Sequence, residues 1–147
     1  MPVCAACGRE NPGGFRFCGA CGAPLAATAA AARLERKVVT VLFCDLVGFT
    51  ERSDRAGPED VKATLRPYHA AIKRTAEGFG GTLDAFVGDG ALVVFGAPSS
   101  HEDDAERAIH VALRVQREIE TLNQAAVGRP LAVRIGIDTG EAIVAVG

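Results

Sequence analysis

One run in the sequence reads Val38-Val39-Thr40-Val41-Leu42-Phe43-Cys44-Asp45-Leu46-Val47-Gly48-Phe49-Thr50. Its first half is apolar and β-branched, which indicates a strand buried on both faces. The run ends in the carboxylate of Asp45, and a short loop with one glycine follows. A carboxylate at the end of a buried strand costs free energy unless a partner group offsets the cost. Because loops at strand ends often carry chemistry, Asp45 is the first candidate functional residue.

Length and composition place the chain among globular proteins. It has 147 residues, of which 48% are hydrophobic and 23% are charged, enough for one core domain and a small appendage. The net charge of −2 indicates neither a nucleic-acid-binding nor a membrane-binding protein. No apolar run is long enough to span a bilayer, and the N-terminus lacks a signal-peptide pattern. The sequence therefore predicts a cytoplasmic protein.

Four of the five cysteines lie in the first 21 residues, as Cys4-Ala5-Ala6-Cys7-Gly8 and Cys18-Gly19-Ala20-Cys21-Gly22. Two residues between cysteines allow both sulfurs to reach one ion, and the glycine after each pair allows a tight turn. Four thiolates suit tetrahedral zinc in a structural site, with Cys4, Cys7, Cys18 and Cys21 as its ligands. A redox pair or iron in the same site is the less favoured alternative. The segment resembles the short zinc ribbons at the N-termini of many multidomain bacterial proteins.

These patterns divide the chain into three parts. Residues 1–22 are expected to form the zinc ribbon, and residues 37–147 a second domain. The linker between them, residues 23–36, has an alanine-rich middle, Ala26–Ala32. Alanine favours helix, but no apolar face is present to dock one, so a frayed helix or a flexible tether is expected.

The second domain is expected to contain two helices and a set of short strands. The predicted strands cover residues 37–44, 82–87, 91–95 and 131–137, with a turn at 138–140 and a further strand at 141–146. The first helix is expected from Pro58 to the glycines at 78–81, and the second from a cap at Ser99 or Ser100 to Gly128. Pro67 lies inside the first helix and costs roughly 3 kcal/mol there, which predicts a kink or break near residues 63–66.

Apolar residues recur at helical spacing in both segments and predict their buried faces. The predicted faces are Val61, Leu65, Tyr68, Ile72, Ala76 and Phe79 in the first helix, and Ala105, Ile109, Ala112, Val115, Ile119 and Leu122 in the second.

The order strand, helix, strand, strand, helix, strand predicts an α+β fold of the ferredoxin-like (βαββαβ) type. In that arrangement the first strand is central and lies beside the hairpin strands. The end of the first strand can therefore meet the hairpin turn Gly88-Asp89-Gly90, so that Asp45 and Asp89 face one another across adjacent strands.

Each aspartate alone has an ordinary explanation. Asp45 could cap its loop, and Asp89 could be a common Asp-Gly hairpin residue. Together, two carboxylates repel unless a cation joins them, and their oxygens suit Mg²⁺ or Mn²⁺. Two such ions about 3.5–4 Å apart can activate a hydroxyl and stabilise a leaving pyrophosphate. Gly48 lets the loop approach phosphates, and the amides of residues 47–50 could donate to them.

Three segments resemble the class III nucleotidyl (adenylyl/guanylyl) cyclases: residues 43–50, residues 80–90, and Arg134-Ile135-Gly136-Ile137-Asp138-Thr139-Gly140-Glu141. The resemblance runs from about residue 36 to residue 147. It implies a ferredoxin-like catalytic core, two metal ions, and a homodimer, or a pair with another cyclase-type chain, with active sites at the interface. The implied reaction is attack of the ribose 3′-hydroxyl of ATP, or of another purine nucleoside triphosphate, on the α-phosphate, giving 3′,5′-cyclic AMP and pyrophosphate.

The resemblance also implies residue roles. Asp45 and Asp89 would bind both metal ions, and the Leu46 carbonyl would bind one of them. The triphosphate would be held by loop residues: Val47, Gly48, Phe49, Thr50 and Gly88.

Two departures from the family pattern affect the expected activity. Ala85 stands where the family usually has a base-selecting lysine, so selection between purines is expected to be weak or absent. The sequence also stops before the family segment that carries a second base-contacting residue, a ribose-orienting asparagine and a transition-state arginine. The alternative to a cyclase is therefore a catalytically silent, cyclase-like module that binds nucleotide or dimerises. A diguanylate cyclase is disfavoured because its Gly-Gly-Asp/Glu-Glu-Phe signature is missing.

Residues 1–147 alone are predicted to have negligible cyclase activity, because two copies would supply two metal half-sites and no complementary half. Incubation of the purified chain with ATP and Mn²⁺, followed by detection of cyclic AMP, checks this prediction. Measurable product would contradict it.

Overall fold

The computed structural model describes residues 1–25, 33–126 and 128–146. The described residues form two compact units, residues 1–34 together with 145–146, and residues 35–144. The alanine-rich segment for which a frayed helix or tether is expected, residues 26–32, lies outside the described residues.

The N-terminal unit is held by short-range pairing and one buried amide. Isolated β-bridges join Val3 to Glu10 and Phe17 to Pro24, one around each Cys-x-x-Cys segment. The side chain of Asn11 is buried, accepts a hydrogen bond from the Gly19 N–H at 3.1 Å, and donates to a carbonyl in its own half. Asn11 therefore links the two halves of a unit that has almost no apolar core.

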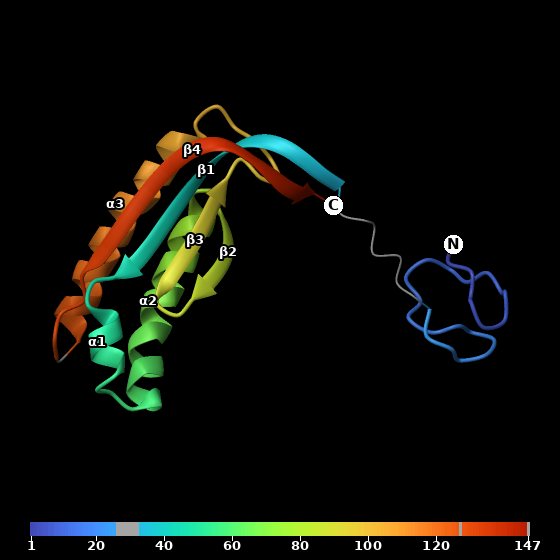
Figure 1. Ribbon diagram of the computed structural model, residues 1–147, viewed down its shortest axis with the longest axis horizontal. Coiled ribbons are helices and arrows are strands. Elements are labelled where there is room, and N and C mark those ends of the chain that lie inside the picture. The colour runs from blue at the N-terminus through green and yellow to red at the C-terminus, as the bar shows by residue number, and fades with distance from the viewer. Residues whose placement is uncertain (26–32, 127, 147) are drawn as a thin grey trace. The chain divides into compact units, whose positions relative to one another are not determined.

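The second unit is a four-stranded sheet with two long helices and one short helix (Figure 1). In chain order its elements are β1 (Arg33–Leu46), α1 (Phe49–Ser53), α2 (Pro58–Gly78), β2 (Thr82–Val87), β3 (Gly90–Phe95), α3 (Asp104–Ala125) and β4 (Val133–Val146). The strand order is β2-β3-β1-β4, and β3 is antiparallel to both β1 and β2. This order, with β1 in the centre, confirms the predicted ferredoxin-like fold.

Helices α2 and α3 pack on the same face of the sheet. The core between them and the sheet contains fully buried side chains from all these layers, among them Leu42, Tyr68, Ile72, Val93, Phe95, Val111 and Val115. Because side chains alternate along a strand, burial of Leu42 and Cys44 under the helices turns Phe43 and Asp45 to the opposite face. No described helix covers that opposite face, and 48% of Phe43 is exposed.

The first half of this unit differs from expectation at two points. The predicted loop after Asp45 contains a short helix, α1, whose N-cap is Gly48. The predicted break near residues 63–66 is absent, because α2 runs from Pro58 to Gly78 with Pro67 inside it, while a kink there stays a prediction. Burial of Tyr68, Ile72 and other side chains just beyond Pro67 offsets the cost of the missing hydrogen bond.

The second helix begins later than predicted, and its predicted buried face is confirmed in its later turns, where Val115 and Ile119 are buried and Ala112 and Leu122 pack against the core. Its N-cap is Asp103, while Ser100 donates its hydroxyl proton to the Gly96 carbonyl. Ala105 and Ile109 are exposed, although both were predicted to be buried. The buried side chains of its first turns are instead Asp104, Ala108 and Val111. This helix has apolar residues on more than one face at its start, so periodicity alone could not fix its rotation.

The predicted turn at residues 138–140 is also wrong, because β4 is a single strand of 14 residues. Strand β1 begins at Arg33, earlier than expected, and is therefore as long as β4, its neighbour in the sheet. The hydroxyls of Thr40 and Thr139 are 2.8 Å apart, and Arg36 contacts Glu141 at 3.5 Å. Pairing with β1 therefore outweighs the local turn preference of Asp138 and Gly140.

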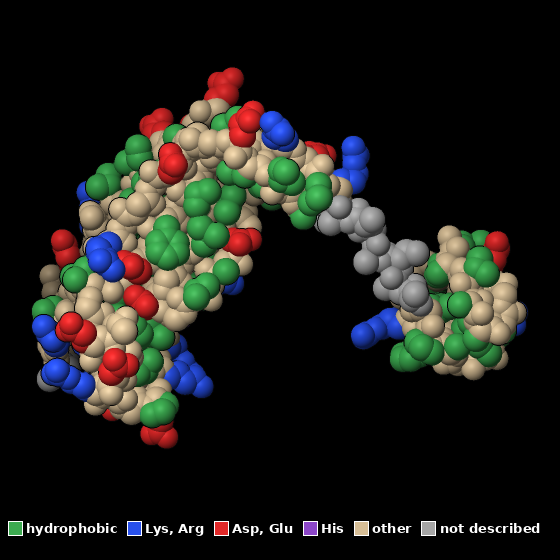
Figure 2. Space-filling view, viewed as in Figure 1, with side chains coloured by type: hydrophobic (Ala, Val, Ile, Leu, Met, Phe, Trp, Pro, Cys, Tyr) green, Lys and Arg blue, Asp and Glu red, His purple; other side chains and the backbone are tan. Residues whose placement is uncertain are grey.

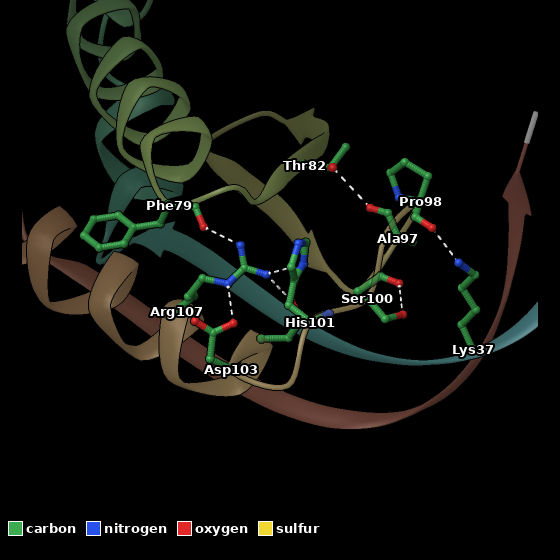
Figure 3. Close-up of polar contacts among 11 residues, drawn as sticks. Lys37, Phe79, Thr82, Ala97, Pro98, Ser100, His101, Asp103 and Arg107 are labelled. Carbon is green, nitrogen blue, oxygen red and sulfur yellow. Dashed lines mark hydrogen bonds and ion pairs between the residues drawn. The ribbon is translucent and has the colours of Figure 1, made fainter.

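Arg107 ties the end of α2 to the start of α3 (Figure 3). Its guanidinium donates to the Phe79 carbonyl at 3.0 Å and to Nδ1 of His101 at 2.8 Å, and it pairs with Asp103 and Asp104. These contacts close the loop between β3 and α3. No helix among the described residues has the length and apolar character needed to cross a membrane.

Gly81 packs closely against core side chains of β3. We therefore expect Gly81→Ala to destabilise the second unit by about 1–3 kcal/mol through overpacking. A Cβ at this position would lie 2.7 Å from Cζ of Phe95 and 2.9 Å from Cγ1 of Val93. Gly140→Ala is the matched control, since a Cβ there meets no atom within 4 Å. Thermal unfolding by circular dichroism measures both variants, and equal midpoints would contradict the expectation.

Candidate functional site

The four cysteines predicted to bind zinc lie together. Their Sγ atoms are all within 4.8 Å of one another. Sγ of Cys4 is 3.5 Å from that of Cys21, and Sγ of Cys7 is 3.7 Å from that of Cys18. Four sulfurs around one zinc, each about 2.3 Å from the metal, are about 3.8 Å apart. The four-thiol set therefore fits a tetrahedral zinc ion.

Backbone amides favour the thiolate form of two of these cysteines. Hydrogen bonds from the N–H groups of Cys21 and Ala20 lower the pKa of Cys18 to about 6. Backbone N–H groups also lower the pKa of Cys4. Because the thiolate is the form that binds metal, the backbone within each Cys-x-x-Cys segment favours the metal-binding form of its first cysteine.

The two candidate aspartates meet at the end of β1. The hairpin turn between β2 and β3 brings Asp89 there, and its Oδ2 accepts a hydrogen bond from the Leu46 N–H at 2.9 Å. Leu46 directly follows Asp45, so the two aspartates belong to one small region at the end of β1. Their predicted role as metal ligands stays a prediction.

Arg134 is a member of this site that the residue-by-residue predictions missed. Its Nε and Nη2 donate to Oδ1 and Oδ2 of Asp45, each at 3.0 Å. This bidentate pair raises the pKa of Arg134. The feature that could have identified Arg134 is the antiparallel register of β1 and β4, which places Arg134 opposite Asp45. In the same register the Val47 N–H donates to the Ala132 carbonyl at 2.8 Å. Arg134 lies in the predicted strand 131–137, but the sequence pattern did not give the register of that strand against β1.

One backbone amide of the predicted phosphate-binding loop already forms a hydrogen bond within the second unit. The Val47 amide is engaged with Ala132, so it is not free to donate to a phosphate. Gly48 has φ +67° and opens α1, while Phe49 and Thr50 form the first turn of that helix. Gly88, with φ +59°, lies in the hairpin turn beside Asp89. The positive φ at both glycines is one that other residues rarely adopt.

Ala85 is half-buried in β2 and pairs with Leu92 of β3. Leu92 also pairs with Phe43 of β1. Its neighbour Val93 is buried under the helices, so Leu92 points to the uncovered face. The side chain at position 85 therefore offers a methyl group and no hydrogen-bonding atom beside an apolar surface.

The acidic site fits a divalent cation by charge and by donor type. Asp45 and Asp89 supply two negative charges, and Arg134 supplies one positive charge. Carboxylate oxygens are the ligands that Mg²⁺ and Mn²⁺ prefer. A cation that took the Asp45 carboxylate would release the guanidinium of Arg134, which is 69% exposed and forms its pair at the surface.

Removal of zinc with a chelator is expected to make residues 1–25 protease-sensitive. In small zinc-binding peptides, metal binding contributes about 10–16 kcal/mol and is coupled to folding. Limited proteolysis with mass spectrometry of the fragments measures the change, and cleavage sites within residues 35–144 serve as the internal control. A ribbon that stays protected in the chelated chain would contradict the zinc assignment.

Comparisons with known families and proteins agree with this geometry. The family model for the adenylate and guanylate cyclase catalytic domain matches residues 32–147, and a zinc-ribbon domain model matches residues 3–25. Adenylate cyclase 1 of Rhizobium meliloti (strain 1021) is 36% identical over 112 residues, which are 74% of this chain and 17% of that protein. A membrane guanylyl cyclase of Dictyostelium discoideum is 33% identical over 113 residues, 76% of this chain and 8% of that protein. The chain thus spans a small part of these relatives.

Solved structures are similar over the same region. The guanylyl cyclase Cya2 superposes with a TM-score of 0.72 and 41% identity, covering 75% of this chain and 57% of that one. The adenylyl cyclase CyaB from P. aeruginosa gives a TM-score of 0.71 and 34% identity, covering 76% and 60%. Because the family model matches residues 32–147 and the ferredoxin-like sheet agrees with the solved structures, the chain belongs to the adenylate and guanylate cyclase catalytic domain family.

Proposed function

We propose that the second unit supplies the metal-binding half of a nucleotidyl cyclase site. The reaction would convert ATP, or another purine nucleoside triphosphate, into a 3′,5′-cyclic nucleotide and pyrophosphate. The observation that carries this proposal is the hydrogen bond from the Leu46 N–H to the Asp89 carboxylate, which holds the turn acid beside the residue that follows the strand-end acid. Relatives named as adenylate and guanylyl cyclases support the reaction class.

Asp45, Asp89 and the Leu46 carbonyl are proposed to hold two Mg²⁺ or Mn²⁺ ions. When bound, such ions activate the ribose 3′-hydroxyl and stabilise charge on the leaving pyrophosphate. The chain's part is to keep the two carboxylates at a fixed separation at the end of a rigid strand.

Residues near the acids are proposed to hold the triphosphate. Gly48, Phe49, Thr50 and Gly88 would approach it through the backbone, while Val47 contributes the shape of the loop because its amide is already engaged. Arg134 is exposed and cationic, so once released from Asp45 it would attract the same phosphates. In the Asp45–Arg134 pair, the guanidinium thus balances the negative charge of the Asp45 carboxylate before a cation binds.

A second copy of this chain, or another cyclase-type chain, is proposed to cover the open face of the sheet. Figure 2 shows apolar side chains gathered over the second unit, and Phe43, Val47 and Val87 are 48%, 47% and 75% exposed. Exposed apolar groups beside an acidic site are typical of a surface that a partner buries. A partner that is another cyclase-type chain would contribute the groups that contact base, ribose and transition state, which a second copy of residues 1–147 does not supply.

Substrate choice, compartment and ribbon metal are also part of the proposal. Ala85 in β2 offers no hydrogen bond to a purine base, so selection between purines is expected to be weak. ATP is the proposed substrate, and GTP is not strictly excluded. Zinc is the proposed ion of the ribbon. A cytoplasmic location is proposed because clustered cysteines that bind metal are typical of a reducing compartment and because the proposed substrate is a nucleoside triphosphate.

A silent, cyclase-like module is the second candidate. Two observations favour it: Ala85 offers no hydrogen bond to a purine, and both carboxylate oxygens of Asp45 are held by Arg134. Such a module would bind nucleotide or dimerise without turnover.

Complementation in trans separates the two candidates. The chain is mixed with the catalytic domain of a cyclase relative whose own two metal aspartates are changed to asparagine, so that neither protein alone holds a complete site. With Mn²⁺ and ATP, we expect cyclic AMP only from the mixture, and a loss of at least about 100-fold with Asp89→Asn in this chain.

The control is Asp84→Asn, which removes a carboxylate of the same hairpin outside the turn. It is expected to leave product formation unchanged. Binding of the two proteins without any product would contradict the cyclase proposal and favour the silent module.

A further inference from the structure

Helix α2 holds the turn that carries Asp89 from the covered side of the sheet. Tyr68 is fully buried, and its hydroxyl donates a hydrogen bond to the Asp89 carbonyl at 2.9 Å. Sγ of Cys44 is 3.4 Å from the same hydroxyl oxygen. Burial raises the pKa of Tyr68, so the hydroxyl keeps its proton and remains a donor. The Asp89 carbonyl is therefore held by a hydrogen bond from a core side chain, that of Tyr68.

The next residue of the helix holds the same turn. Nε2 of His69 is 3.0 Å from the Gly88 carbonyl, and because a carbonyl only accepts, this nitrogen carries the proton. The imidazole also stacks on Phe86 of β2, with ring centroids 4.0 Å apart and planes inclined by 23°. Two consecutive side chains of α2 thus donate to two consecutive carbonyls of the turn.

We infer that Tyr68 and His69 are positioning residues that set the orientation of the Asp89 carboxylate at the metal site. The inference rests on the proposed function of Asp45 and Asp89. It adds that α2, which contributes no ligand, determines how well those ligands are placed.

The flexibility of the turn explains why such anchors are needed. Glycines flank Asp89 on both sides, and Gly88 has φ +59°, so the backbone here has more freedom than elsewhere in the hairpin. Three hydrogen bonds restrict it: the Leu46 N–H to the Asp89 carboxylate, and those of Tyr68 and His69 to the two carbonyls. Two of the three come from α2.

The hydroxyl of Tyr68 serves no packing purpose that phenylalanine could not serve. Its ring is in the core, and a buried hydroxyl stabilises a protein only when it finds a partner. The partner here is the main chain of a candidate metal ligand. Groups that orient metal ligands typically change metal affinity by 10- to 100-fold when removed.

Tyr68→Phe and His69→Phe test the inference, since each keeps the ring and removes one hydrogen bond. Thr75→Val is the matched control, because it removes a buried hydroxyl from the same helix. In the metal-free chain, hydrogen exchange is measured at the Leu46 amide and compared with the Leu42 amide in the middle of β1. In a Mn²⁺ titration, paramagnetic broadening of the amides of residues 45–47 and 88–90 gives the affinity.

Each substitution is expected to speed exchange at Leu46 about threefold to tenfold relative to Leu42, and to weaken Mn²⁺ binding about threefold to tenfold, with no such change in Thr75→Val. Equal Leu46 exchange in all variants would overturn the inference, whether or not the metal binds. Faster exchange at Leu46 with unchanged Mn²⁺ affinity would also overturn it. Absence of Mn²⁺ broadening in the unsubstituted chain would instead count against the proposed function, and the inference would fail with it.

Discussion

Strand β1 is hydrogen-bonded along both edges, to β3 on one side and to β4 on the other, and this central position fixes the candidate site. Each neighbour brings one charged group to the end of β1. The hairpin that includes β3 brings Asp89, and β4 brings Arg134. Because Leu42 and Cys44 are buried under the helices, Asp45 must point to the uncovered face, where the other two groups meet it.

Most of the sheet could be predicted from local pattern. The β-branched run before Asp45, the Gly-Asp-Gly turn and the apolar spacing of α2 each predict one structure, and together they give the ferredoxin-like order. The placement of Asp89 beside β1 followed from that order, without knowledge of any contact. The cluster of the four ribbon cysteines followed from their spacing alone, because two residues between thiols leave few other geometries.

The features that local pattern missed depend on partners far away in the sequence. Asp138 and Gly140 favour a turn, yet pairing with an extended β1 keeps them in a strand. Pro67 disfavours helix, yet burial of Tyr68 and Ile72 keeps α2 intact. The rotation of α3 is decided by the sheet, which selects Ala108 over Ile109. Arg134 was missed because its contact with Asp45 joins residues 89 positions apart.

The sulfur atoms of this chain fall into two chemical classes. Cys44 lies in the core with no exposed surface, and burial raises its pKa, so it stays a protonated thiol. The ribbon contains the exposed Cys7 and Cys21, and a Cys18 whose pKa is lowered to about 6. Alkylating reagents attack accessible thiolates, and Cys44 is neither accessible nor a thiolate, so in the folded chain they would spare the sulfur next to Asp45. Alkylation of Cys44 would therefore require the core of the second unit to open, so this single buried thiol is a built-in probe of that opening.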